Sequence, residues 1–237
     1  MSIIPLYKLL YMLLPLSLVG FFYFSWVGKK SEIALATLRM SVQLLVIGYV
    51  LTSLFTSNSM TLLMVLVVVM VISASLIVRR NIRHKDIKTF ILILGAITLA
   101  GSLNLAWVLW GVLDLDNPLE PRFVIPLAGM IYANAMNAIS LCAERYEKEK
   151  EHGQSHEKAR AIAFKSSMMP QINSFLAVGF VSLPGMMTGQ ILSGIDPLIA
   201  VRYQIVVMAM ILSSGAMSNI LYLSTLNSRF LARIDQK

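Results

Sequence analysis

Apolar runs of about twenty residues, the length of α-helix that crosses a bilayer, recur along this chain and limit its possible folds more than any other feature. Of the 237 residues, 57% are hydrophobic and only 14% are charged. We therefore predict an all-α, polytopic membrane protein in which a single transmembrane domain occupies residues 1–237. Seven spans are expected, at about 5–27, 33–55, 60–78, 89–112, 121–142, 170–195 and 201–225.

The charges between these runs alternate in kind. The segments after spans one, three, five and seven are basic, whereas the others are uncharged, acidic or very short. Because basic loops stay in the cytoplasm, we expect the N-terminus outside and the C-terminus inside. No small-residue cleavage site precedes Gly28, so we expect the first span to be retained and not removed as a signal peptide. The basic residues that set the orientation are Lys29, Lys30, Arg79, Arg80, Arg83, Lys85, Lys88, Arg145, Lys148, Lys150, Lys158, Arg160, Lys165, Arg229, Arg233 and Lys237.

The longest hydrophilic segment, at about 143–165, follows span five. Opposite charges four residues apart, such as Arg145 and Glu149, predict that the helix of span five continues into water for several turns. Gly153 indicates a break, and Ser155 suits the N-cap of a second helix that re-enters the membrane. We therefore expect a cytoplasmic helical hairpin, which either is simply solvated or docks a cytoplasmic protein.

Enzyme motifs are absent from the sequence. It has no GxxxxGK[ST] phosphate loop, no HExxH or GxSxG motif and no paired intramembrane carboxylates. The single cysteine, Cys142, excludes an internal disulfide and a Cys-cluster metal site. Solvation explains Asp114, Asp116 and Glu120 in an outer loop better than cation capture does. We expect a protein that is not an enzyme, that binds no cofactor itself and whose loop charges, +8 in total, do not serve nucleic acid.

Polar side chains inside the apolar runs are better guides to function, because each is costly in lipid. Arg39 and Gln43 lie one turn apart near the inner end of span two, and Arg39 is long enough to reach the headgroups, whereas Gln43 is not. Asn134 and Asn137 lie among small residues in span five, where they either join helices or line a path. The further polar positions of spans six and seven are Asn173, Gln190 and Gln204.

The outer half of span six holds the run Leu183–Gln190. Pro184 removes a helical hydrogen-bond donor, and Gly185 and Gly189 allow another backbone to approach closely. We expect this part of the span to bend and pack tightly. Some of the fifteen methionines offer thioether ligands to a soft metal, although packing explains such flexible side chains better. The thioether candidates are Met130, Met186 and Met187.

The run Leu183–Gln190, followed by Gly194–Pro197 and Tyr203–Ile205, resembles the Fet-type iron-export ABC permeases, a family that includes plant aluminium-tolerance proteins. The resemblance extends over nearly the whole chain. The other matching stretches are Arg39–Leu51, Ile125–Met130 and Asn134–Met136.

The resemblance implies a permease subunit that works with a separate cytoplasmic ABC ATPase, which binds ATP and Mg²⁺, in an assembly with two copies of each. It implies iron export across the inner (plasma) membrane, while another metal or a nucleotide sugar stays open as cargo. A non-transporting scaffold also stays open, and an ion-driven transporter is disfavoured because no intramembrane acid is obvious. The residues expected to line the path are Arg39, Gln43, Asn134, Asn137 and Gln190, those expected to form its moving part are Pro184, Gly185 and Gly189, and those expected to couple to the ATPase are Glu147, Gly153, Lys158 and Arg160.

Overall fold

The computed structural model describes residues 5–28, 32–57, 59–83, 85–113 and 115–226. The regular structure of these residues is helical apart from one isolated bridge between Val178 and Ser182, which confirms the all-α prediction. Contacts divide the chain into two compact units, 1–58 and 59–237. That the two act as one permease domain stays a prediction. The residues of our charge analysis that lie outside the described part are Lys29, Lys30, Asp114, Arg229, Arg233 and Lys237.

Six helices of the described residues are long and apolar enough to cross a membrane. They correspond to six of the seven predicted spans. Their orientation with respect to the two sides of the membrane stays a prediction. The six are Tyr7–Val27, Glu32–Ser57, Met60–Asn81, Ile87–Val112, Pro121–Glu151 and Pro197–Thr225.

The first unit is a pair of helical rods. One rod consists of α1 (Leu6–Leu9), the 3₁₀ turn η1 (Leu10–Met12) and α2 (Leu13–Val27), and the other is α3 (Glu32–Ser57). The first rod ends at Gly28, whose φ of 78° is the left-handed conformation that glycine adopts most readily at a helix C-terminus. The Tyr23 hydroxyl donates to Glu32 Oε2 at 2.6 Å and joins the two rods.

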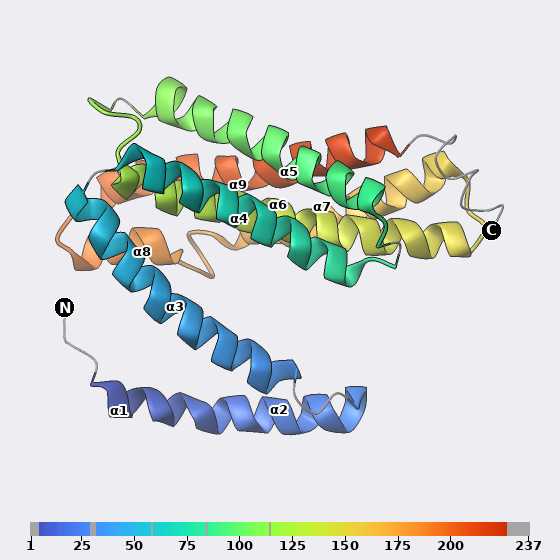
Figure 1. The fold of residues 1–237 in the computed structure, drawn as a ribbon, viewed down its shortest axis with the longest axis horizontal. Helices are drawn as coiled ribbons and strands as arrows, with labels where there is room; N and C mark the ends of the chain where they lie inside the picture. Colours follow the sequence, from blue (N-terminus) through green and yellow to red (C-terminus); the bar gives the residue numbers. More distant parts are fainter. Residues whose placement is uncertain (1–4, 29–31, 58, 84, 114, 227–237) are drawn as a thin grey trace. The chain divides into compact units, whose positions relative to one another are not determined.

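The second unit is a helical bundle built around α6, which packs against α4, α5, α7 and α9 (Figure 1). Its core is apolar and close-packed, with Ile97, Ile131 and Ile139 fully buried. The Tyr132 ring lies so close to Gly101 of α5 that a Cβ at that position would overlap it. The elements of the unit are α4 (Met60–Asn81), α5 (Ile87–Ala106), the π-helical stretch η2 (Trp107–Val112), α6 (Pro121–Glu151), α7 (His156–Ala177), α8 (Gly185–Leu192) and α9 (Pro197–Thr225).

The predicted sixth span, 170–195, is two helices and not one. The first of them, α7, ends at Ala177, the chain continues irregularly, and α8 begins at Gly185. Gly179 has a φ of 92°, outside the helical region, and Pro184 cannot donate the hydrogen bond that would continue α7. Pro184 therefore precedes a helix and does not bend one. Whether this broken segment crosses the membrane as a seventh span stays a prediction.

Candidate functional site

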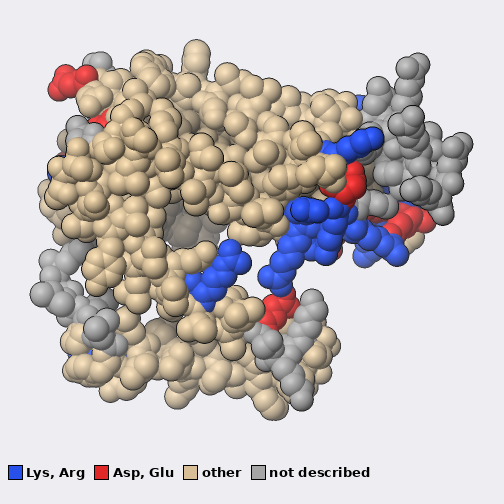
Figure 2. Space-filling view, in the orientation of Figure 1, with Lys and Arg blue, Asp and Glu red and all other residues tan. Residues whose placement is uncertain are grey.

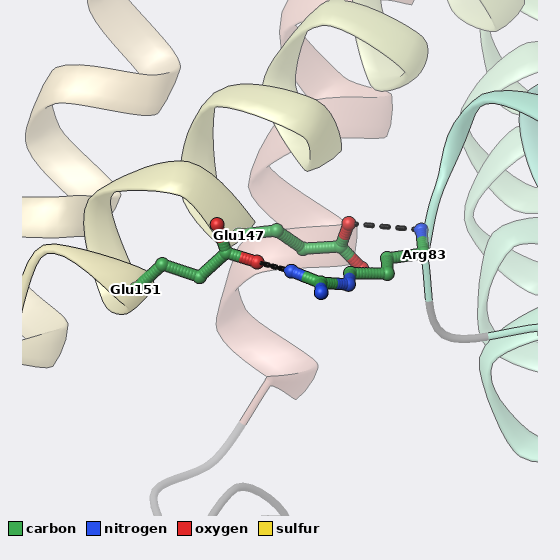
Figure 3. A network of polar contacts seen from close by, with 3 residues as sticks. All are labelled: Arg83, Glu147 and Glu151. Atoms are coloured by element: carbon green, nitrogen blue, oxygen red, sulfur yellow. Dashed lines mark hydrogen bonds and ion pairs between the residues drawn. The ribbon is translucent and has the colours of Figure 1, made fainter.

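The charged connections of the second unit meet at one end of its bundle, where Figure 2 shows Lys and Arg side chains gathered. The turn between α4 and α5 there contacts the extension of α6. The Arg83 backbone N–H donates to Glu147 Oε2 at 3.0 Å, and the Arg83 guanidinium pairs with Glu151 (Figure 3). The two connections that we expected on the cytoplasmic side thus lie on the same side of the bundle.

The two helices and the turn of the predicted hairpin are present, and its cytoplasmic position stays a prediction. The first helix, α6, continues to Glu151, Gly153 turns the chain with a φ of 75°, and α7 begins at His156. Ser155 is the N-cap, since its Oγ accepts from the Lys158 backbone N–H at 3.3 Å. The expected pair of Arg145 and Glu149 is formed at 2.7 Å. Further along, the hydroxyl of Tyr146 lies 2.8 Å from His156 Nδ1, which ties the two helices of the hairpin together.

A groove of about 350 Å³ runs between the start of α7 and the end of α9 at this charged end. Arg160, one of the predicted coupling residues, lines it and is exposed. Most of the other lining residues are apolar, so the groove combines an apolar floor with a cationic edge. They are Ala161, Phe164, Ile220, Leu223 and Ser224.

A second cavity, of about 210 Å³, lies between α6, α7 and α9 and is called here the polar cavity. The predicted path residues Asn134 and Asn137 both line it. The structure brings them together with Ser167, Gln171 and Ser174 of α7, which our sequence reasoning missed. These three are spaced i, i+4 and i+7 and therefore share one helical face. That polar stripe is the signal in the sequence that identifies them.

Two polar side chains of the polar cavity donate hydrogen bonds to backbone carbonyls of their own helices. Asn134 Nδ2 donates to the Met130 carbonyl at 2.8 Å, and Ser167 Oγ donates to the Phe164 carbonyl at 2.9 Å. Behind the wall, Asn219 Nδ2 donates to Ser167 Oγ at 2.9 Å, while the buried Asn219 Oδ1 has no partner among the described residues. Gln171 is only 8% exposed, and its Oε1 is likewise without a partner there.

A third cavity, of about 420 Å³, opens at the break between α7 and α8 and is called here the outer cavity, after the side of the membrane on which we expect it. Its walls are mostly apolar. Gln204, which is buried, also lines it, with an Oε1 that no described residue contacts by a hydrogen bond. Phe175 and Met208 line both this cavity and the polar cavity, so these two side chains lie between them.

Other predicted path residues lie elsewhere. Arg39 and Gln43 are exposed on α3, in the first unit. Gln190 is on α8, where its buried Oε1 has no partner among the described residues, and it lines neither cavity. A Cβ at Gly185 or Gly189 would meet no described atom within 4 Å. Close packing of these glycines against another chain stays a prediction.

The thioether candidates do not converge on one cavity. Met187 lines the outer cavity, whereas Met130 and Met186 line neither it nor the polar cavity. Among the described residues there is also no group of three or more His, Cys, Asp or Glu side chains that could hold a metal ion. A role for the methionines as metal ligands stays a prediction.

Sequence comparison decides the family. The model of the "Uncharacterised protein family (UPF0014)" matches residues 7–231, nearly the whole chain. The chain belongs to the UPF0014 family. Among the relatives of this UPF0014 protein is the "Probable iron export permease protein FetB" of Escherichia coli (strain K12), 36% identical over 200 residues, which cover 77% of this chain and 75% of FetB.

Two further relatives match over a similar length. The "UPF0014 membrane protein YjkA" of Bacillus subtilis (strain 168) is 32% identical over 226 residues, covering 89% of this chain and 88% of YjkA. The "UPF0014 membrane protein STAR2" of Oryza sativa subsp. japonica is 30% identical over 209 residues, covering 82% and 72%. No solved structure matches the chain. These findings confirm the resemblance and establish a multi-pass membrane protein of the UPF0014 family.

Proposed function

We propose that this UPF0014 protein is the permease subunit of an ABC transporter that exports iron, driven by a separate cytoplasmic ATPase. The observation that carries the proposal is the polar cavity between α6, α7 and α9. Asn137 and Ser174 on its rim are exposed at the surface of the bundle, within the predicted spans. Polar groups at that depth normally face a water-filled path or another protein surface and not lipid.

The arrangement of the two cavities supports a path along α7 and α9. The polar cavity and the outer cavity meet at Phe175 and Met208, so a small displacement of either side chain would join or separate them. The outer cavity reaches the irregular backbone between α7 and α8, and irregular backbone at membrane depth is tolerated where it lines a cavity. In this proposal the break lets cargo leave on the outer side.

Coupling to the ATPase is assigned to the charged end. The hairpin of α6 and α7 and the groove beside Arg160 offer the ATPase a contact of mixed character. From the Ser155 cap, α7 runs past its internal proline, Pro170, to the wall of the polar cavity at Gln171, so movement of the hairpin would reach the cavity through this one helix. ATP and Mg²⁺ would bind to the ATPase, and two permease chains would complete the assembly.

The iron assignment follows from a relative whose name specifies iron export, FetB, at 36% identity. Its test is reconstitution of the full chain with its ATPase subunit in vesicles, followed by ATP-dependent movement of iron, copper, zinc and a nucleotide sugar. We expect ATP-dependent transport of iron to be faster than that of the other three cargoes. Movement of another cargo without iron would show that iron is not the cargo. Binding of the ATPase without movement of any cargo would support the scaffold alternative.

A matched pair of variants tests the moving part. We expect Gly185→Leu with Gly189→Leu to abolish export while membrane insertion stays intact. Gly20→Leu serves as the control, because a side chain at that helical glycine also meets no described atom within 4 Å. Normal export by the double variant would contradict the role given to this helix.

A further inference from the structure

The exposed surfaces of the long helices in the second unit differ in composition. Large apolar side chains such as Val65, Val68 and Ile72 cover the exposed side of α4, and a surface of this kind suits lipid. Along α6, which the structure describes from end to end, Leu141 is the only large apolar side chain that is exposed. The other exposed positions of its predicted span carry small or polar residues, so α6 does not present a typical lipid surface.

The helix beside it, α7, carries both kinds of surface. Met169, Ile172 and Leu176 lie on one exposed side and are all apolar. A second exposed side is small or polar, and two of its residues, Pro170 and Ser174, line the polar cavity next to α6. This second side and the exposed stripe of α6 are together called here the small-polar face. Its exposed residues are Pro126, Ala133, Asn137, Pro170, Asn173 and Ser174.

Lipid cannot satisfy the polar groups of the small-polar face. No side-chain hydrogen bond joins Asn137 or Asn173 to another described residue. Pro126 and Pro170 both lie inside helices, and neither can donate a hydrogen bond to the carbonyl four residues before it. At membrane depth, neighbouring protein or enclosed water normally satisfies such groups. We therefore expect protein to cover this face.

The chemistry of the face fits a second copy of itself. A two-fold interface places the same patch against itself, so every group must suit its own equivalent. An asparagine amide meets this condition because it carries both donors and an acceptor. None of the six residues of the face is charged, so two copies do not repel each other there, whereas the basic charged end would do so. Small residues such as Ala133 also let helices approach closely.

We infer that the small-polar face is the interface between two copies of this chain, with the Asn137 and Asn173 amides forming hydrogen bonds across it. This inference rests on the proposed function, since it names the surface on which the two permease chains meet. The polar cavity opens on this face at Asn137 and Ser174. The cavities of the two copies therefore open into the same interface, and the transport path lies between the copies.

Cysteine cross-linking of the full chain in membranes tests the interface. With Cys142→Ala as background, Asn137→Cys and Asn173→Cys each place a thiol on the face, while Ile172→Cys and Val68→Cys place one on exposed apolar surfaces of α7 and α4. We expect a short, membrane-permeable bismaleimide to give at least about tenfold more dimer from the first pair, because an interface holds its residues at a high effective concentration. Dilution with added lipid should not change that yield.

Two further variants measure what holds the copies together. Ala133→Phe places a bulky ring on the face without entering the core, since Ala133 is exposed, and should lower the dimer yield of Asn173→Cys by about tenfold or more. Thr98→Phe, at an exposed position of α5, is the matched control and should leave the yield unchanged. Asn137→Leu should raise the dissociation constant of the dimer by about threefold to tenfold, measured by energy transfer between labelled chains in vesicles.

Each other outcome contradicts a separate statement. Equal cross-linking at all four cysteine positions, or none at Asn137→Cys and Asn173→Cys, would overturn the interface. An unchanged dissociation constant in Asn137→Leu would overturn the role given to the amides. If the face does not cross-link while reconstituted vesicles export iron, the inference fails and the proposed function stands. If the face cross-links but the vesicles move no cargo, the proposed function fails and the interface stands.

Discussion

The charged end and the polar cavity of the second unit differ in the contacts that their polar groups make. Ion pairs and a helix cap lie at the charged end, whereas amide and hydroxyl groups line the cavity. At the charged end, Arg83 reaches both Glu147 and Glu151, and Ser155 caps α7. In the polar cavity, the carbonyl oxygen of Gln171 has no partner although the residue is 8% exposed.

This difference separates two roles for polar residues in one bundle. Leaving a buried polar atom unpaired costs about 1–3 kcal/mol, whereas an exposed ion pair contributes about 0–1 kcal/mol. The paired groups at the charged end therefore define the shape of the hairpin at little cost. The unpaired carbonyl oxygen of Gln171 lowers stability, and leucine at this position would avoid that cost.

The largest effect is expected from Gln171→Leu, which tests whether the unpaired side chain in the polar cavity serves transport or only structure. We expect ATP-dependent export to fall by about tenfold, because one polar side chain of the proposed path is replaced by an apolar one. The melting temperature should stay the same or rise, since an unpaired polar group is replaced by an apolar one of similar size. Export assays and thermal unfolding of the same preparation check both statements. A variant that is less stable and still exports normally would make Gln171 a structural residue.

The second prediction concerns Gly215, where a Cβ would overlap the amide of Gln171. Because that amide is the flexible end of a side chain beside a cavity, Gly215→Ala should displace it and reduce export by about threefold, which corresponds to less than 1 kcal/mol. Thermal unfolding should change little.

Two glycines of α5 provide reference substitutions for that result, one with a steric overlap and one without. At Gly101 a Cβ would overlap the buried ring of Tyr132, so Gly101→Ala should cost about 1–3 kcal/mol of stability. At Gly95 a Cβ meets nothing within 4 Å, so Gly95→Ala should stabilise by about 0.5–1 kcal/mol. If Gly215→Ala lowers stability as much as Gly101→Ala does, the region around Gln171 is rigid packing and not an adaptable binding site.

At the charged end, a smaller effect is expected from Ser155→Ala. Loss of the cap should destabilise the first turn of α7 by about 1 kcal/mol, while Ser155→Asp keeps an acceptor for the Lys158 N–H and should preserve it. Hydrogen exchange of the amides of residues 156–159 measures this directly. Equal exchange in the two variants would show that the cap does not hold the hairpin.

The smallest effect is expected from Glu151→Gln. The two side chains of its pair with Arg83 are 73% and 52% exposed, so solvent already screens their attraction. We expect a stability change below about 0.5 kcal/mol and an equally small change in export. A large loss of export with unchanged stability would instead give Glu151 a direct role in contact with the ATPase.

Much of the fold was predictable because lipid imposes simple rules on sequence. Run length identified six helices, and Gly153 with Ser155 identified the hairpin break. A bend of the sixth span at Pro184–Gly189 was predicted, but its division into two helices was not, because the residues on both sides of Gly179 are equally apolar and hydropathy carries no information on backbone conformation.

The polar cavity was predictable only in part. Asn134 and Asn137 are conspicuous within an apolar run, but Gln171 lies where the charged hairpin passes into the membrane and therefore looks like an ordinary interfacial residue. Its spacing from Ser167 and Ser174 carries the missing information. That Asn219 supports Ser167 from behind could not be predicted, since it depends on how α9 packs against α7.

The most direct test of the central claim is whether water reaches the polar cavity in the membrane. With the single cysteine removed by Cys142→Ala, Ser174→Cys would place a thiol in the cavity wall, and Ile172→Cys would place one on an exposed part of the same helix outside it. Thiosulfonate reagents dissolved in water react with the thiolate, which forms only where water is present. We predict that Ser174→Cys is modified at least about tenfold faster than Ile172→Cys in intact membranes, because thiolate formation in lipid is strongly disfavoured. Equal, slow modification at both positions would contradict the claim that this cavity belongs to a transport path.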